Sequence, residues 1–227
     1  MKTRNLLLTL LLVIISVIQL YGSYINSRPV EYAVKPLILA WITLYFLLNT
    51  RPARGRNLVI LAFLFSWIGD FILMFAWKND LFFFAGVGGF FLSQVTYIAA
   101  FSRYALSDGR GFLSRKPVWI LPFIAYLVGM AVLLLPHLEG IMIPVVLLYA
   151  VSLVAMSALA LNRFGLSLAT DARMVFAGSV LFVMSDTLLA VNKFMTSLPH
   201  GGFWVMLTYI LAQYLIMMGL KGRGIKA

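Results

Sequence analysis

The chain has 227 residues, of which 63% are apolar and 11% charged, and its formal net charge is +11. Soluble domains carry charge on about a quarter of their residues, so this composition excludes an ordinary soluble protein and indicates a membrane protein. A nucleic-acid-binding protein is excluded as well, because the basic residues lie in short stretches between apolar runs. The absence of cysteine excludes disulfides and thiolate chemistry.

Eight apolar segments follow one another along the chain, and we expect each to be a membrane-spanning helix. They lie at about 6–25, 33–49, 57–77, 81–102, 117–135, 141–161, 174–192 and 202–220. Most reach the roughly 20 residues that a spanning helix needs, and their continuous apolar character favours helices over barrel strands. The first segment has some features of a signal peptide, but its cleavage pattern is poor, so we expect it to be retained. Prolines at or near predicted helix starts are Pro36, Pro117, Pro122 and Pro144.

The basic residues predict the orientation of these helices. Fourteen lie at the ends and in the connections on one side: Lys2, Arg4, Arg51, Arg54, Arg56, Arg103, Arg110, Arg115, Lys116, Arg163, Arg173, Lys221, Arg223 and Lys226. The other side carries four: Arg28, Lys35, Lys78 and Lys193. The positive-inside rule therefore places both termini in the cytoplasm, and we expect a bacterial cytoplasmic membrane.

An internal repeat is predicted within a single transmembrane domain that covers residues 1–227. The segment 64–70 resembles 181–186, 91–94 resembles 210–213, 36–39 resembles 144–147, and 48–49 resembles 161–162, at offsets consistent with a duplication whose loops vary in length. The halves, about 1–110 and 111–227, would each hold four helices and enter the membrane from the same side. The sequence thus predicts an all-α protein with a 4+4 parallel repeat about an axis along the membrane normal.

Two acidic residues, Asp70 and Asp186, lie inside the third and seventh apolar segments. A carboxylate there is costly, so an intramembrane acid indicates a functional site by default. Asp70 follows Asn57 by 13 residues and Asp186 follows Arg173 by 13, so we expect equal depth, each about 7 residues or ~10 Å from the outer end. Two carboxyl groups that face each other in an apolar bundle cannot easily both ionise. One could donate a proton while the other stabilises positive charge, which suits cleavage of an acetal or vinyl ether.

Other polar residues are candidates for substrate binding beside the acids. Gln94 and Gln213 occupy similar places on the fourth and eighth helices, each with a tyrosine one turn away, and hydrogen bonding between helices is an equally open interpretation. Lys35 and Lys193 could form a cationic rim for a lipid phosphate, although snorkelling to the interface also explains them. The predicted set is Lys35, Gln94, Tyr97, Asn192, Lys193, Tyr209 and Gln213.

No metal or other cofactor is predicted. A catalytic zinc site needs three protein ligands, usually histidines, and His137 and His200 both lie in outer loops away from the acids. The glycine-rich stretch 86–89 lies within a spanning segment and lacks the strand-turn-helix context of a phosphate loop. It indicates close packing between helices instead.

Together these residues resemble the YhhN-like lysoplasmalogenases. The motifs are Lys35-Pro36-Leu37, Gly69-Asp70, Gln94-x-x-Tyr97, Ser185-Asp186 followed by Asn192-Lys193-Phe194, and Tyr209-x-x-Ala212-Gln213. The resemblance implies an eight-helix enzyme that hydrolyses the vinyl ether of a lysoplasmalogen to a fatty aldehyde and a glycerophospho-alcohol. It implies that Asp70 and Asp186 are the catalytic acids, and that the partner is a lysophospholipid in the bilayer rather than an obligate protein. Family members often carry His at the position of Gln94, where glutamine can only orient water or substrate.

Two other function classes stay open. Intramembrane acids at a repeat interface also mark ion pathways, so a proton-coupled carrier is the main alternative. The segments around Asp70 and Asp186 contain no proline, which disfavours the broken helices of many carriers. A structural protein whose acids only bond to neighbouring helices is the third interpretation.

Overall fold

The computed structural model describes residues 2–52, 55–103 and 109–221, and these form an all-helical bundle. Eight of its helical segments are long and apolar enough to span a membrane, with η1, α6 and η2 forming one of them. Many large apolar side chains are exposed along these helices, as expected for a surface that faces lipid, so the chain is a membrane protein. The elements are α1 (Lys2–Tyr24), α2 (Arg28–Asn49), α3 (Arg56–Leu73), α4 (Asp80–Arg103), α5 (Phe112–Arg115), η1 (Pro117–Ile120), α6 (Leu121–Leu134), η2 (Leu135–His137), α7 (Met142–Asn162), α8 (Ala169–Phe194) and α9 (Gly201–Lys221).

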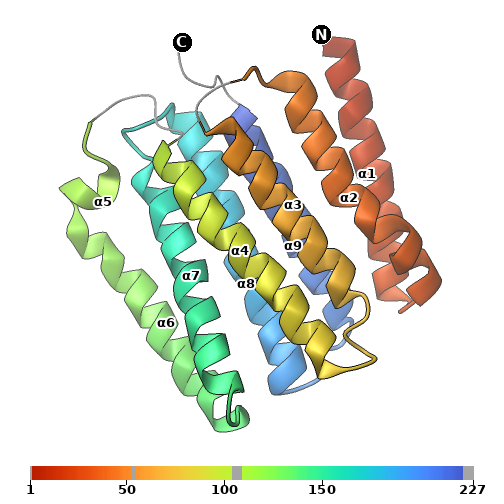
Figure 1. The fold of residues 1–227 in the computed structure, drawn as a ribbon. Coiled ribbons are helices and arrows are strands. Elements are labelled where there is room, and N and C mark those ends of the chain that lie inside the picture. The colour runs from red at the N-terminus through yellow and green to blue at the C-terminus, as the bar shows by residue number, and fades with distance from the viewer. Residues whose placement is uncertain (1, 53–54, 104–108, 222–227) are drawn as a thin grey trace.

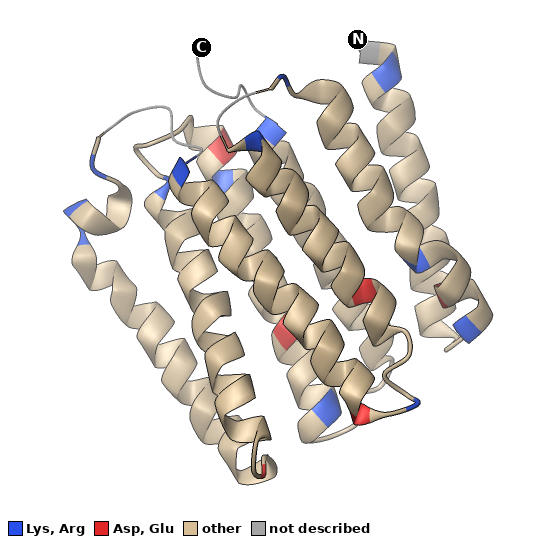
Figure 2. Cartoon of the chain, in the orientation of Figure 1, with Lys and Arg blue, Asp and Glu red and all other residues tan. Residues whose placement is uncertain are grey.

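The helices run up and down through the bundle, so that the start of α1 and the end of α9 lie at the same end (Figure 1). Lysine and arginine gather at this end and are sparse at the opposite one (Figure 2). Arg54, Arg223 and Lys226 lie outside the described residues. The asymmetry agrees with the charge pattern of the sequence, and the cytoplasmic location of this end stays a prediction.

Two expectations about helix boundaries are wrong. Pro36 lies inside α2, which begins at Arg28 with Pro29 in its first turn. Pro36 has no backbone N–H to donate to the carbonyl oxygen of Tyr32, four residues earlier, and membrane bundles tolerate such a gap. The Trp67 indole donates to the carbonyl oxygen of Pro36 itself at 2.8 Å, which joins α3 to α2. Helix α3 ends at Leu73 rather than near residue 77, because the backbone tightens into turns with bonds between residues three apart, such as Phe75 to Ile72.

Glycines bring the helices of each half into close contact, as the sequence predicts for the stretch 86–89. A Cβ atom built on Gly69 would lie 2.9 Å from the carbonyl oxygen of Gly86, and one on Gly89 would lie 2.9 Å from the Cα of Gly69. In the second half, a Cβ on Gly178 would lie 2.7 Å from the carbonyl oxygen of Ala212. Small residues let the backbones approach, so α3 is held tightly to α4 and α8 to α9. Both acids therefore lie on firmly packed helices.

The main backbone contacts between the halves are those of α4 with α7 and of α9 with α1 and α2. A two-fold relation between the halves would exchange the α4–α7 and α9–α2 pairs, so the arrangement is compatible with the repeat, which remains a prediction. Helix α6 packs against α7 and the short elements beside it. It lies at the edge of the bundle (Figure 1), and Leu134 is its one buried residue.

Candidate active site

A cavity of about 310 Å³ lies where α2, α3, α4, α8 and α9 meet, towards the end of the bundle opposite to the start of α1. Both intramembrane acids line it, together with residues from both halves of the chain. Among the predicted site residues, those that line it are Lys35, Asp70, Asp186, Asn192, Lys193 and Tyr209. The fold thus brings together six of the nine residues that the sequence analysis selected.

Asp70 lies one turn before the end of α3 and is buried. Its Oδ1 is 3.5 Å from the Nζ of Lys35 on α2, and its Oδ2 accepts a 2.7 Å hydrogen bond from the hydroxyl of Tyr209 on α9. A lysine at this distance favours the ionised carboxylate, and the phenol satisfies one of its lone pairs. Lys35 was predicted to hold a phosphate, but here it pairs with the acid itself.

A buried hydrogen-bond network holds Tyr209 in place. The amide of Gln213 donates to Tyr209 at 3.4 Å and to Ser66 at 3.0 Å, and its carbonyl oxygen accepts from the hydroxyl of Tyr97 at 2.6 Å. Neither Tyr97 nor Gln213 lines the cavity, and both are fully buried. Tyr97 and Gln213 therefore orient the side chain of Tyr209, and they support the cavity wall from the interior of the bundle without lining the cavity.

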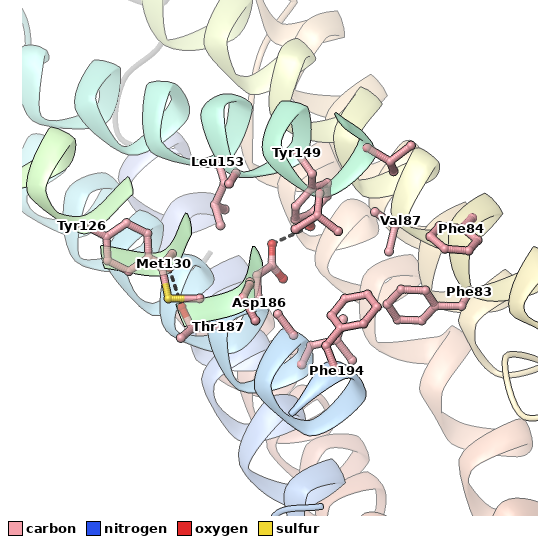
Figure 3. A pocket seen from close by; sticks show the side chains of 16 residues that line it. Phe83, Phe84, Val87, Tyr126, Met130, Tyr149, Leu153, Asp186, Thr187 and Phe194 are labelled. Carbon is pink, nitrogen blue, oxygen red and sulfur yellow. Dashed lines mark hydrogen bonds between the residues drawn. The ribbon is translucent and has the colours of Figure 1, made fainter. Parts of the chain in front are cut away.

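Asp186 lies on α8 and has a different set of partners. Its Oδ2 accepts hydrogen bonds from the hydroxyl of Tyr149 at 2.5 Å (Figure 3) and from the amide of Gln94 at 3.3 Å. The hydroxyl of Ser152 donates in turn to the carbonyl oxygen of Gln94. Within the described part of the chain, these donors to Asp186 are neutral and all meet one oxygen, so its Oδ1 is left to carry a proton or contact a substrate.

Both acids thus line one cavity without a hydrogen bond between them in the described residues. The sequence predicts that each acid lies about 7 residues from the outer end of its helix. In the structure, Asp70 lies three residues before the end of α3 and Asp186 lies eight residues before the end of α8, so the helix ends do not support equal depth. The two carboxyl groups line the same cavity. They differ in their surroundings, because one has a cation beside it and the other has only neutral donors.

A second cavity, of about 60 Å³, opens on the other side of Asp186 and is lined almost wholly by apolar side chains. Figure 3 shows Phe83, Phe84 and Phe194 on one side of the acid and Met130 and Leu153 on the other. Asp186, Phe83 and Leu189 line both cavities. The acid therefore lies at a boundary between a polar space and an apolar one.

The remaining predicted residues lie at the rim of the polar cavity. Lys193 pairs with Asp80 at 2.8 Å, and both side chains are partly exposed. The side-chain oxygen of Asn192 accepts a 2.8 Å hydrogen bond from the backbone of Leu198, so it shapes the connection between α8 and α9.

Three polar residues at the site were not predicted from the sequence: Glu31, Tyr149 and Ser152. Glu31 lies one turn before Lys35 on α2 and lines the polar cavity. Tyr149 and Ser152 lie three residues apart on α7, so they share a face of that helix. The same one-turn spacing singled out Gln94 and Tyr97 on the fourth span. Applied to the sixth span, this criterion would also have predicted Tyr149 and Ser152.

In the described residues, no three histidine, cysteine or acidic side chains come together as a metal ion would require. His200 stacks on Tyr24 with ring centroids 4.2 Å apart, and His137 contacts the carbonyl oxygen of Leu133. The polar groups that meet at the cavity are instead carboxyl, ammonium and phenol groups. Such groups can exchange protons with a substrate and stabilise a cation.

The chain is similar in sequence to curated proteins at about 30% identity. The chain is 29% identical over 191 residues to Lysoplasmalogenase TMEM86A of Bos taurus, and the aligned region covers 81% of this chain and 74% of that protein. It is 32% identical over 160 residues to Lysoplasmalogenase TMEM86B of Sus scrofa, and that aligned region covers 70% of this chain and 62% of that protein. No solved structure matches significantly. The YhhN family matches residues 30–220, which is most of the chain and includes every residue of the site, so this protein belongs to the YhhN family.

Proposed function

We propose that the protein hydrolyses the vinyl ether bond of a lysoplasmalogen by acid/base catalysis. A proton is added to the vinyl carbon that is not bonded to oxygen, which leaves an oxocarbenium ion. Water then adds to the cationic carbon and loses a proton, and the resulting hemiacetal breaks down to a fatty aldehyde and a glycerophospho-alcohol. One water is consumed, and the proton taken from the catalytic acid is returned. The names of the matched relatives support this substrate class.

The surroundings of the two acids suggest their roles. Lys35 stabilises negative charge on Asp70, so Asp70 is suited to act as the carboxylate that stabilises the oxocarbenium ion and accepts a proton from water. Asp186 has neutral donors on one oxygen and borders the apolar cavity, so it is suited to hold the proton that is transferred. Acid and base differ here through their partners, as in other enzymes that use two carboxyl groups.

The observation that carries this proposal is the position of Asp186 at the boundary of the polar and apolar cavities, with Asp70 across the polar one. A lysolipid has its reacting bond between a charged head and one apolar chain. Lys193 is the rim cation best suited to its phosphate, because its pair with Asp80 is exposed and such pairs contribute little stability. A phosphate can therefore displace Asp80 at small cost.

The test measures aldehyde release from a lysoplasmalogen by the purified protein and by Asp70→Asn and Asp186→Asn. Each variant keeps the shape of the side chain but cannot take its part in proton transfer, so we expect kcat to fall about 100-fold or more. Glu139→Gln, in an exposed loop, is the matched control and should keep wild-type turnover. A lysolipid with a saturated alkyl ether is the control substrate, because it has no double bond to protonate.

Turnover near the wild-type value in both aspartate variants would contradict the proposal, as would equal cleavage of the alkyl ether. If reconstituted vesicles carried a proton current without lipid turnover, the carrier alternative would be favoured.

A further inference from the structure

A third cavity, of about 430 Å³, lies beneath α6 on the far side of the apolar cavity at Asp186. It is bounded by η1, α6, α7 and α8, and its walls include Trp119, Phe123, Val154 and Val180. Tyr126 lines both this cavity and the 60 Å³ cavity, so the two spaces adjoin at its ring. Among the described residues that line these two cavities, Asp186 is the one charged side chain.

These cavities exist because α6 stands away from α8. Helix α6 packs against α7 and nearby short elements, and it buries one residue, Leu134. A 2.6 Å hydrogen bond between the hydroxyls of Tyr126 and Thr187 joins it to α8 across the gap (Figure 3). Packed helices normally interlock their side chains, so a helix that leaves a space of this size on its inner face indicates room for another apolar group.

The path from the acid has the length of a lipid tail. Phe176, at the far end of the third cavity, lies ten residues before Asp186 on α8, which corresponds to about 15 Å along the helix. The hydrocarbon core of a bilayer is ~30 Å thick, so one tail extends through about half of it. The three cavities thus follow the order of a single-chain lipid: a charged space, an acid at the reacting bond, and an apolar path of one tail's length.

We propose that the apolar cavities on either side of Tyr126 form the binding site for the single hydrocarbon chain of the substrate, and that the third cavity determines the chain length that the protein prefers. The inference rests on the proposed function for the identity of the bound lipid. A chain in this site holds the bond next to its first carbon against Asp186, so the site also aligns the substrate for proton transfer. The path through the two apolar cavities is that of one tail, so we expect lysolipids to bind better than two-chain lipids.

The test fills the third cavity without touching the acids. Val180→Trp places a large ring into it from α8, at a position already half-exposed and therefore tolerant of a larger side chain. Val128→Trp, on the exposed surface of α6 and lining neither cavity, is the matched control. For both variants, kcat/KM is measured with lysoplasmalogens of long and of short alkenyl chain.

We expect Val180→Trp to lower the long-chain to short-chain ratio of kcat/KM about tenfold or more, since apolar pockets discriminate by this amount when a few methylenes cannot be accommodated. Val128→Trp should leave the ratio unchanged. Equal losses for long and short chains in Val180→Trp, with folding retained by size-exclusion chromatography, would overturn the inference.

A binding measurement separates this inference from the proposed reaction. Non-hydrolysable alkyl-ether lysophospholipids of both chain lengths are titrated against the wild-type protein, Val180→Trp and Val128→Trp. A selective loss of long-chain affinity in Val180→Trp supports the chain site even if the protein hydrolyses no vinyl ether. Binding that is unaffected by Val180→Trp, beside intact lysoplasmalogen turnover, would reject the chain site and leave the proposed function standing.

Discussion

At the scale of single residues, the site depends on which side chain contacts each acid. Asp70 and Asp186 look alike in sequence, since each follows a small residue within an apolar run. The structure gives Asp70 an ammonium group and a phenol, and it gives Asp186 a phenol and an amide. A buried pair with this asymmetry can divide the roles of acid and base, which two identical environments could not do.

Tyr149 is the partner that distinguishes Asp186, and its loss gives a test at this scale. Tyr149→Phe removes the 2.5 Å hydrogen bond while it preserves the ring that lines the apolar cavity. A hydrogen bond to a neutral carboxyl group is worth about 0.5–1.5 kcal/mol, so we expect kcat to fall roughly 2- to 10-fold if the bond positions Asp186 for proton transfer. KM should change little, because the apolar wall remains.

The control is Tyr21→Phe, on the exposed face of α1, which should have wild-type kinetics. Unchanged kcat in Tyr149→Phe would show that this phenol does not position the acid. A rise in KM alone would assign it to substrate binding instead.

At the scale of helices, the acids are positioned by close packing within each half. Gly69 precedes Asp70 directly, and it faces Gly86 and Gly89 across the α3–α4 contact. Any separation of these helices displaces the backbone that carries Asp70. The second acid is held in a comparable way, because α8 contacts α9 through Gly178 and Gly219. The glycine-rich stretch thus serves the site through geometry rather than through contact with a ligand.

Gly89→Ala tests this packing. Its Cβ would lie 2.9 Å from both the Cα and the N of Gly69, so the helices must move apart, and overpacking of this kind costs about 1–3 kcal/mol. We expect a lower midpoint of thermal unfolding in detergent and a loss of turnover larger than the loss of folded protein.

Gly88→Ala is the matched control, one residue away on the same helix. A Cβ there meets no atom within 4 Å, and alanine favours helix over glycine, so stability should stay the same or rise. Equal behaviour of the two variants would show that the α3–α4 contact has room to adjust.

At the scale of the whole molecule, the charge asymmetry between the two ends predicts how the bundle sits in the membrane. The end that holds the start of α1 and the end of α9 carries most of the described basic residues (Figure 2). The polar cavity lies towards the opposite end, beside Asn192 and Lys193. If the basic end is cytoplasmic, the polar cavity lies towards the outer leaflet.

The absence of cysteine makes this orientation directly measurable. Glu139→Cys and Arg110→Cys place single thiols in exposed connections at opposite ends of the bundle. In intact cells, a membrane-impermeant maleimide should label Glu139→Cys and should label Arg110→Cys only after permeabilisation. The reverse pattern would place both termini outside and the polar cavity towards the inner leaflet.

The sequence by itself determined the class of protein, the eight spans and the two acids, because each depends on local composition. An apolar run of about 20 residues spans a bilayer whatever its neighbours, and a carboxyl group within it is conspicuous for the same reason. Family motifs added further site residues. The exception was Pro36, where a local rule predicted a helix start and the helix instead begins at Arg28 and continues through the proline.

Only the tertiary structure decided what each polar side chain does. Lys35 approaches Asp70 and Tyr149 approaches Asp186 across helix pairs that no spacing within one segment can predict. Gln213 and Tyr97 lie behind the cavity for the same reason. The space beneath α6 was likewise invisible in the sequence, because a cavity is a property of how side chains from several helices meet, and an apolar residue that lines one looks like an apolar residue that fills a core.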